Sequence, residues 1–264
     1  MAIPLSPLHE AIHKQTTKEM IRDKIVSMIA SGILQVGDEL PSERELAGML
    51  MVSRETVRGA VQRLAGEGLV QVSQGARTRI AKVNVEVGSQ RIGVTNPTSI
   101  NGYSLDQVHA ARLLVETSVV AEAARNLSAE DIRRLEDSIL AQQAACNDPV
   151  RFLICDREFH LTIYYACTNR LLADFVVDLY TYMLDHRRIA MGQPGAIEKS
   201  LEDHRFIVNA LKMRNPEAVS AAFANHILRI HDTSRAVDTG GKDMIQAAAR
   251  SARLGTAGGE KETA

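Results

Sequence analysis

The feature that most constrains the fold is a pair of short helices predicted on either side of a tight turn, within residues 40–58. Ser42 can cap the first helix, and Glu45, three residues later, completes a capping box. Ser53 can cap the second helix. One face of that second helix is apolar at helical spacing: Val57, Ala60, Val61 and Leu64. The opposite face is polar and basic: Arg54, Arg58, Gln62 and Arg63.

Two capped helices joined by a short polar turn form a helix-turn-helix arrangement. An arginine at the start of the second helix suits DNA, because a guanidinium can bond both guanine O6 and N7 in the major groove. Two short predicted strands, at 69–72 and 77–80, then flank a glycine-containing turn and form a wing. The alternative is an ordinary helical hairpin and β-hairpin with solvated charges. The added wing favours DNA binding.

Residues 17–81 resemble the winged helix-turn-helix domain of the GntR family of bacterial transcription regulators. The resemblance rests on four segments: residues 29–34, 36–47, 52–58 and 64–70. It implies that arginines of the two short helices contact DNA, that Ser53 and Thr56 lie near phosphates, and that the wing tip approaches the duplex. The expected DNA-binding residues are Arg44, Ser53, Arg54, Thr56, Arg58, Gln74 and Gly75.

The net charge of the 264-residue chain is −1, which on its face argues against a nucleic-acid partner. The distribution of charge matters more than its sum. Residues 54–79 contain five arginines against two glutamates, a net charge of +3 on the proposed DNA surface. Since affinity scales with the phosphates neutralised, this modest charge predicts a homodimer acting on an inverted repeat of double-stranded DNA.

The location of the protein is indicated by what its sequence lacks. No apolar run approaches the roughly 18 residues of a membrane span, and the N-terminus lacks the basic-then-apolar layout of a signal peptide. The three cysteines, Cys146, Cys155 and Cys167, show no CxxC spacing. Reduced thiols in a cytoplasmic protein are therefore expected, with no membrane partner.

The order of the chain predicts a mainly α protein: an N-terminal winged helix-turn-helix domain and a C-terminal all-α bundle of six to seven helices. The expected divisions are a flexible arm at 1–16, the winged domain at 17–81, a linker at 82–103, the bundle at 104–236 and a flexible tail at 237–264. Cap signals place the bundle helices at about 104–126, from 128, at 148–167, 169–191, 197–213 and 215–235. A short helix at 244–254 is possible in the tail.

Four residues of the bundle form a candidate metal site. Asp156 and His160 are four residues apart and therefore share one helical face, while His204 and His226 lie on the two last predicted helices. A carboxylate with three imidazoles suits Zn²⁺ or another borderline divalent ion, with coordination positions left open. Spacing alone does not select this set, because other histidines also lie in predicted helices: His109, His186 and His231.

Residues 104–235 are similar to the ligand-sensing FCD domain of the FadR subgroup of the GntR family, an all-α bundle around a buried pocket. The matching motifs occur in order at 156–160, 169, 202–205 and 225–226. The resemblance implies that Asp156, His160, His204 and His226 bind a divalent metal, Zn²⁺ first, with Ni²⁺ or Mn²⁺ as alternatives. It also implies that a small organic acid binds through its carboxylate to the metal and to Arg112. The alternative for Arg112 is a surface ion pair with Glu116 four residues later.

These features predict a ligand-responsive transcription regulator, usually a repressor in this family, rather than an enzyme. The rival interpretation is a metal-dependent hydrolase in the bundle, for which His231 and Asp232 supply a His-Asp pair. It lacks support from any nucleophile or phosphate-binding motif in the sequence. In a third interpretation the chain binds DNA and its metal is purely structural.

Overall fold

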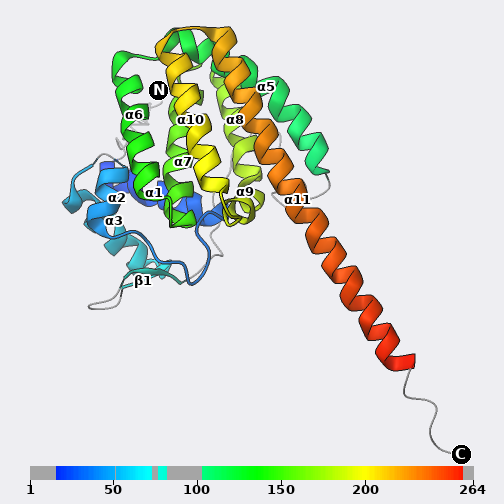
Figure 1. Ribbon diagram of the computed structural model, residues 1–264. Coiled ribbons are helices and arrows are strands. Elements are labelled where there is room, and N and C mark those ends of the chain that lie inside the picture. Colours follow the sequence, from blue (N-terminus) through cyan, green and yellow to red (C-terminus); the bar gives the residue numbers. More distant parts are fainter. Residues whose placement is uncertain (1–15, 51, 73–76, 82–102, 258–264) are drawn as a thin grey trace, which may run out of the picture.

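The computed structural model describes residues 16–50, 52–72, 77–81 and 103–257 of the chain. A small winged domain packs beside a larger bundle of long helices (Figure 1). The expected fold class, mainly α with a winged helix-turn-helix and an all-α bundle, is confirmed. The expected N-terminal arm, most of the linker, and the wing-tip residues Gln74 and Gly75 lie outside the described residues.

The winged domain is built from three helices and one small antiparallel hairpin. Its elements are α1 (Thr17–Ala30), α2 (Glu43–Met49), α3 (Arg54–Gly66), β1 (Val70–Gln71) and β2 (Arg79–Ile80). In the hairpin Val70 pairs with Ile80. The capping box of Ser42 and Glu45 is present, and Ser53 accepts a bond from the backbone of Thr56. Both helix starts are therefore where the sequence predicts them.

Packing between α1 and α3 forms the core of this domain and decides which face of α3 is left outside. The apolar face of α3 is buried against α1: Val57, Ala60, Val61 and Leu64 meet Ile21, Ile25, Met28 and Ile29. Because the apolar stripe is buried, the basic face of α3 remains on the surface.

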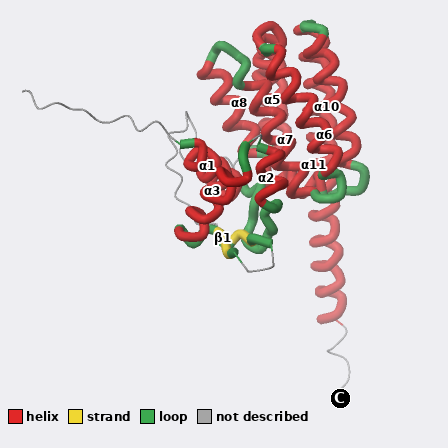
Figure 2. Tube along the Cα trace, turned by 90° about the vertical axis from the view of Figure 1, so that its left-hand side faces the viewer, coloured by secondary structure: helices red, strands yellow, loops and turns green. Residues whose placement is uncertain are grey.

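Seven further helices form the described part of the bundle (Figure 2). They are α5 (Leu105–Asn126), α6 (Ala129–Ala144), α7 (Pro149–Tyr164), α8 (Arg170–Tyr182), α9 (Leu184–Met191), α10 (Ala196–Lys212) and α11 (Pro216–Ala257). Helix α7 is buried along most of its length and packs against α5, α6, α8 and α9. It is therefore the central element of the bundle and can carry interior chemistry.

Two helix boundaries differ from the sequence prediction. The single helix expected over 169–191 is divided at Met183, which ends α8 and begins α9. The last helix continues to Ala257 instead of ending near Arg235, and it extends past the bundle (Figure 1). Gly240 and Gly241 each cost only about 1 kcal/mol in a helix interior, so they weaken the helix but do not end it.

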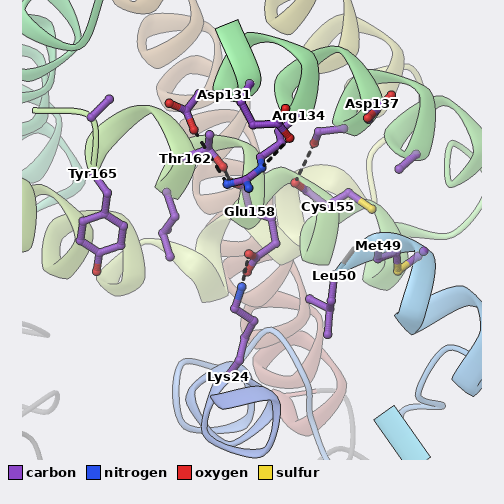
Figure 3. Close-up of a pocket in the computed structure, with 16 residues that line it drawn as sticks. Lys24, Met49, Leu50, Asp131, Arg134, Asp137, Cys155, Glu158, Thr162 and Tyr165 are labelled. Atoms are coloured by element: carbon purple, nitrogen blue, oxygen red, sulfur yellow. Dashed lines mark hydrogen bonds and ion pairs between the residues drawn. The ribbon is translucent and has the colours of Figure 1, made fainter. Parts of the chain in front are cut away.

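The winged domain contacts the bundle through α7 and α9. A cleft of about 760 Å³ lies between the two parts. Figure 3 shows it, with Lys24 of α1 reaching Glu158 of α7. Three more polar contacts join the two parts: Arg151 with Glu45, Arg157 with Ser27, and Arg188 with Asp38. Among the described residues, no helix is both long and apolar enough to cross a membrane.

Candidate metal centre and DNA-binding surface

The basic face of α3 presents its arginines to solvent. Arg54 is exposed in the first turn of the helix and Arg44 is exposed on α2. Within the described part of the chain, neither has a carboxylate partner. Arg58 is 46% exposed and pairs with Glu43 at 3.1 Å and Glu55 at 3.5 Å. The first two guanidinium groups can therefore meet a duplex directly, whereas Arg58 would first exchange its carboxylates for phosphate or base oxygens.

The hydroxyl groups expected near phosphates lie at the start of the same helix. Ser53 Oγ and Thr56 Oγ1 are 2.6 Å apart, and the Ser53 oxygen accepts the backbone N–H of Thr56. These bonds fix the N-terminus of α3, where free backbone N–H groups favour an anion. The start of α3 therefore offers both hydroxyl groups and free backbone N–H groups to a phosphate.

Three histidines meet in the centre of the bundle, and all three are fully buried. His160 of α7, His204 of α10 and His226 of α11 place one nitrogen each within 4.8 Å of the others. The Nε2 atom of each ring has no hydrogen-bond partner among the described residues. Unpaired buried nitrogens are costly, and three of them converging on one point form a ready set of metal ligands.

The other ring nitrogen of each histidine is engaged, so the rings are held in place. The His204 Nδ1 atom lies 2.6 Å from Gln142 Oε1, and His226 Nδ1 lies 3.2 Å from an oxygen of Asp203. His160 Nδ1 lies 3.2 Å from the Tyr164 hydroxyl. Supporting contacts of this kind select the tautomer and aim Nε2 at a metal. The residues therefore fit a divalent ion.

Burial also sets the protonation of the three rings. It lowers the pKa of His160 and His226 well below the usual value, and it lowers the pKa of His204 to about 3. The neighbouring Arg187 contributes in the same direction. The imidazoles are therefore neutral at physiological pH, the form in which they coordinate metals.

Asp156 lies beside this triad but is held by other partners. One of its oxygens is 3.7 Å from His160 Nε2 and 3.5 Å from His204 Nε2. Arg187 Nη2 donates to both carboxylate oxygens at 2.8 and 2.7 Å, and the Tyr180 hydroxyl donates at 2.5 Å. Burial is the largest single influence and acts to raise the pKa of Asp156, but Arg187, the neighbouring histidines and the Tyr180 hydroxyl together outweigh it, so the pKa is lowered. The carboxylate is therefore ionised and adjacent to the three nitrogens.

Comparison with known proteins identifies both parts of the chain. The model of bacterial regulatory proteins of the gntR family matches residues 17–80, and the FCD domain model matches residues 107–229. The chain belongs to the GntR family of bacterial transcription regulators, with an FCD domain. This GntR regulator is thus a DNA-binding protein, and the family consists of transcription regulators rather than enzymes.

Individual relatives are similar over nearly the whole regulator. The HTH-type transcriptional repressor NanR of Cronobacter sakazakii is 27% identical over 228 residues, covering 85% of this chain and 87% of that protein. NanR of Klebsiella aerogenes is 27% identical over 227 residues, with the same coverage. The solved structure of Escherichia coli McbR/YncC has a TM-score of 0.50 at 20% identity, covering 83% of this chain and 97% of that one, which shows the shared fold.

Arg112 is inside the FCD bundle of the regulator rather than on its surface. It is 2% exposed, and its Nε donates to Glu116 at 2.5 Å. The ion pair expected at this spacing forms, but it is buried. Tyr164 donates to the other Glu116 oxygen at 2.6 Å and also lies against His160, which links Arg112 to the histidine triad.

Sequence reasoning missed Arg187, which is fully buried beside Asp156. It occupies the same helical stripe as the buried residues Leu184 and Met191, three positions before and four after it. This register was the available signal, because an arginine in line with apolar residues faces the interior. Gln142, which orients His204 from another helix, carried no comparable signal in the sequence, whereas Asp203, which orients His226, lies inside the matched motif at 202–205.

The His-Asp pair considered for a hydrolase lies elsewhere. His231 stacks on His109 with ring centroids 4.1 Å apart, and its Nε2 is 2.8 Å from Asp106. Asp232 has a side chain that is 68% exposed. Among the described residues, these groups do not join a metal-binding cluster of the kind the triad forms. The three cysteines are free, with Cys155 and Cys167 buried.

Proposed function

We propose that this GntR regulator is a metal-dependent repressor whose affinity for its operator is controlled by a small organic acid bound inside the FCD bundle. The observation that carries the proposal is the triad of buried histidines with oriented rings and unpaired Nε2 atoms. The similar NanR proteins are transcriptional repressors, which supports repression rather than activation for this regulator. A regulator of this kind acts in the cytoplasm, where the operator is.

The proposed metal ligands are Asp156, His160, His204 and His226. Three imidazoles and one carboxylate suit Zn²⁺, with Ni²⁺ or Mn²⁺ as alternatives. A bound divalent ion would offer open coordination positions to the carboxylate of the effector, with Arg112 as the expected second contact. The buried chain from Arg112 through Glu116 and Tyr164 to His160 supports this placement.

The DNA side of the proposal uses a homodimer on an inverted repeat. Each protomer places α3 in the major groove of one half-site. The proposed contacts come from Arg44, Ser53, Arg54, Thr56, Arg58, Gln74 and Gly75. The exposure of Arg44 and Arg54 supports this assignment. Two copies are needed because one basic face neutralises too few phosphates for useful affinity.

Helices α7 and α9 join the proposed sensor to the winged domain. Helix α7 carries Asp156 and His160 together with Arg151 and Glu158, which contact the winged domain. An effector that alters the packing of α7 would therefore change the placement of α3. By linkage, the effector can weaken DNA binding only as far as it prefers the non-binding arrangement, typically about 1–3 kcal/mol.

The test combines two variants in a fluorescence-anisotropy titration with DNA from the regulator's own upstream region. Arg54→Ala should cost about 1–3 kcal/mol of DNA affinity and relax base preference at one position. His204→Ala should leave DNA affinity intact but remove both the bound metal and the response to organic acids. Arg133→Ala, on the exposed face of α6, is the matched charge control. Unchanged affinity for Arg54→Ala, or an unchanged response for His204→Ala, would contradict the proposal.

A further inference from the structure

The fully buried ionic groups around the triad already balance one another. Arg112 is paired with Glu116, and Arg187 is paired with Asp156. The Tyr164 and Tyr180 hydroxyls donate to Glu116 and Asp156 and therefore keep their protons, and buried imidazoles carry no charge in the form that binds a metal. The formal charge of this cluster is therefore zero without a metal.

A divalent ion at the triad would bring two positive charges beside carboxylates that already have cationic partners, since Asp203, which contacts His226, is itself paired with Arg229. Buried charge without compensation is strongly unfavourable, so the partner that enters with the metal must supply the missing negative charge. A monocarboxylate supplies only half of it. The charge balance of the cluster thus favours an effector with two acidic groups.

Arg187 shows where the second acidic group would bind. Its Nη2 is used on Asp156, but its Nε and Nη1 have no acceptor among the described residues, although the side chain is fully buried. A buried guanidinium normally uses all its edges, because unpaired charged donors are costly. The Asp156 carboxylate contacts both sides: it accepts from Arg187 Nη2 at 2.8 and 2.7 Å, and one of its oxygens lies 3.7 Å from His160 Nε2 and 3.5 Å from His204 Nε2. One small molecule can therefore reach both the triad and Arg187.

Resting on the function proposed above, we infer that the effector is a small dianionic acid, with one acidic group at the metal and the other on Arg187. Arg187 is then the residue that sets selectivity for two charges over one. Arg112 differs from it because two of its nitrogens, Nε and Nη2, donate to Glu116, whereas Arg187 donates to Asp156 through Nη2. The Nε and Nη1 groups of Arg187 are the buried donors that have no acceptor among the described residues.

The experiment compares matched ligands on the full-length protein loaded with Co²⁺, whose visible spectrum reports that the metal stays bound. Dicarboxylates of three to six carbons, with and without hydroxyl groups, are each measured against their own monomethyl ester by calorimetry and thermal shift. The ester keeps the carbon chain of the diacid and has one charge fewer. We expect at least one diacid to bind tenfold or more tightly than its ester and to change DNA affinity.

Variants then assign the selectivity to Arg187. Arg187→Lys keeps a positive charge beside Asp156 but has fewer donors, so it should fold, keep its Co²⁺ spectrum and reduce the diacid-to-ester ratio at least threefold. Arg187→Gln should bring that ratio within twofold of one. Arg205→Lys, at an exposed site on α10, is the matched control and should leave the ratio unchanged.

The outcomes separate the two proposals. Esters or other monoanions that bind as tightly as diacids, and still change DNA affinity, would overturn the dianion inference and leave the proposed function standing. A full diacid-to-ester ratio in Arg187→Lys and Arg187→Gln would overturn the role of Arg187. A Co²⁺-loaded protein whose DNA affinity responds to neither class would overturn both the inference and the sensor function.

Discussion

The contact between Arg188 and Asp38 should hold the winged domain on the bundle, and a double-mutant cycle can measure its strength. Arg188 Nη1 donates to Asp38 Oδ2 at 2.7 Å, and Nη2 donates to Oδ1 at 2.8 Å. Nη1 also donates to the Ile33 carbonyl at 2.6 Å. The contact therefore joins α9 to the segment between α1 and α2 by three bonds. The cycle uses Arg188→Ala, Asp38→Ala and the double variant.

The magnitude follows from the geometry and from the exposure of the pair. Exposed ion pairs contribute about 0.2–1 kcal/mol, whereas hydrogen bonds to charged groups contribute about 1.5–3 kcal/mol. The side chains of Arg188 and Asp38 are 21% and 16% exposed, so solvent screens them only in part. We expect a coupling free energy of about 1–2 kcal/mol. Each single variant also loses one bond outside the pair, Arg188→Ala the bond to the Ile33 carbonyl and Asp38→Ala the bond from the Gln35 backbone N–H, and the cycle removes these from the coupling.

Hydrogen exchange measured by mass spectrometry gives the opening free energy of the winged domain in each variant. Each single variant should lower that free energy, and the double variant should lower it by about 1–2 kcal/mol less than the sum of the two. The surface pair Lys212–Glu136 of the bundle provides the control cycle, with no effect on the winged domain. Losses that add within about 0.3–0.5 kcal/mol would refute the contact, since independent sites are additive.

Three further predictions concern the bundle. Burial lowers the pKa of the central histidines, that of His204 to about 3, so on acidification the unfolded chain takes up protons before the folded one does. The free energy of unfolding of chelator-treated protein should therefore fall below about pH 6.5, by up to about 1.4 kcal/mol per pH unit for each histidine. Urea titrations at several pH values measure this fall. Gln142→Leu should lower zinc affinity about 10–100-fold in a chelator competition, whereas Gln143→Leu on the same helix should not. Burial raises the pKa of Cys155 to about 12, so iodoacetamide at pH 8 should modify the half-buried Cys146 first and reach Cys155 only on unfolding, as read by mass spectrometry.

Local signals made much of the fold predictable. Ser42 and Ser53 cap their helices through contacts only three residues away, and the buried face of α3 follows from its own periodicity. The break at Met183 was not predictable in this way. It separates α8 from α9 without a proline or glycine at that position, and no side chain caps the start of α9.

The residues of the candidate site also differ in whether local sequence spacing could predict them. Asp156 and His160 share a face of one helix, so the sequence could pair them, and the resemblance supplied His204 and His226. Gln142 reaches His204 across 62 positions, and such a contact depends on how the helices pack. Arg187 was missed for a related reason, because an arginine is read as a surface residue unless its helical register is known.

Helix α9 carries two consecutive arginines whose side chains contact different parts of the protein. Arg187 binds Asp156 in the interior of the bundle, and Arg188 binds Asp38 of the winged domain. An eight-residue helix is too short to bend between neighbours, so a remodelled pocket that relocates one guanidinium also disturbs the other. Anyone retuning this protein as a biosensor should therefore expect ligand preference and signal amplitude to change together. Variants selected for a new inducer would need their output recalibrated at the Arg188–Asp38 contact.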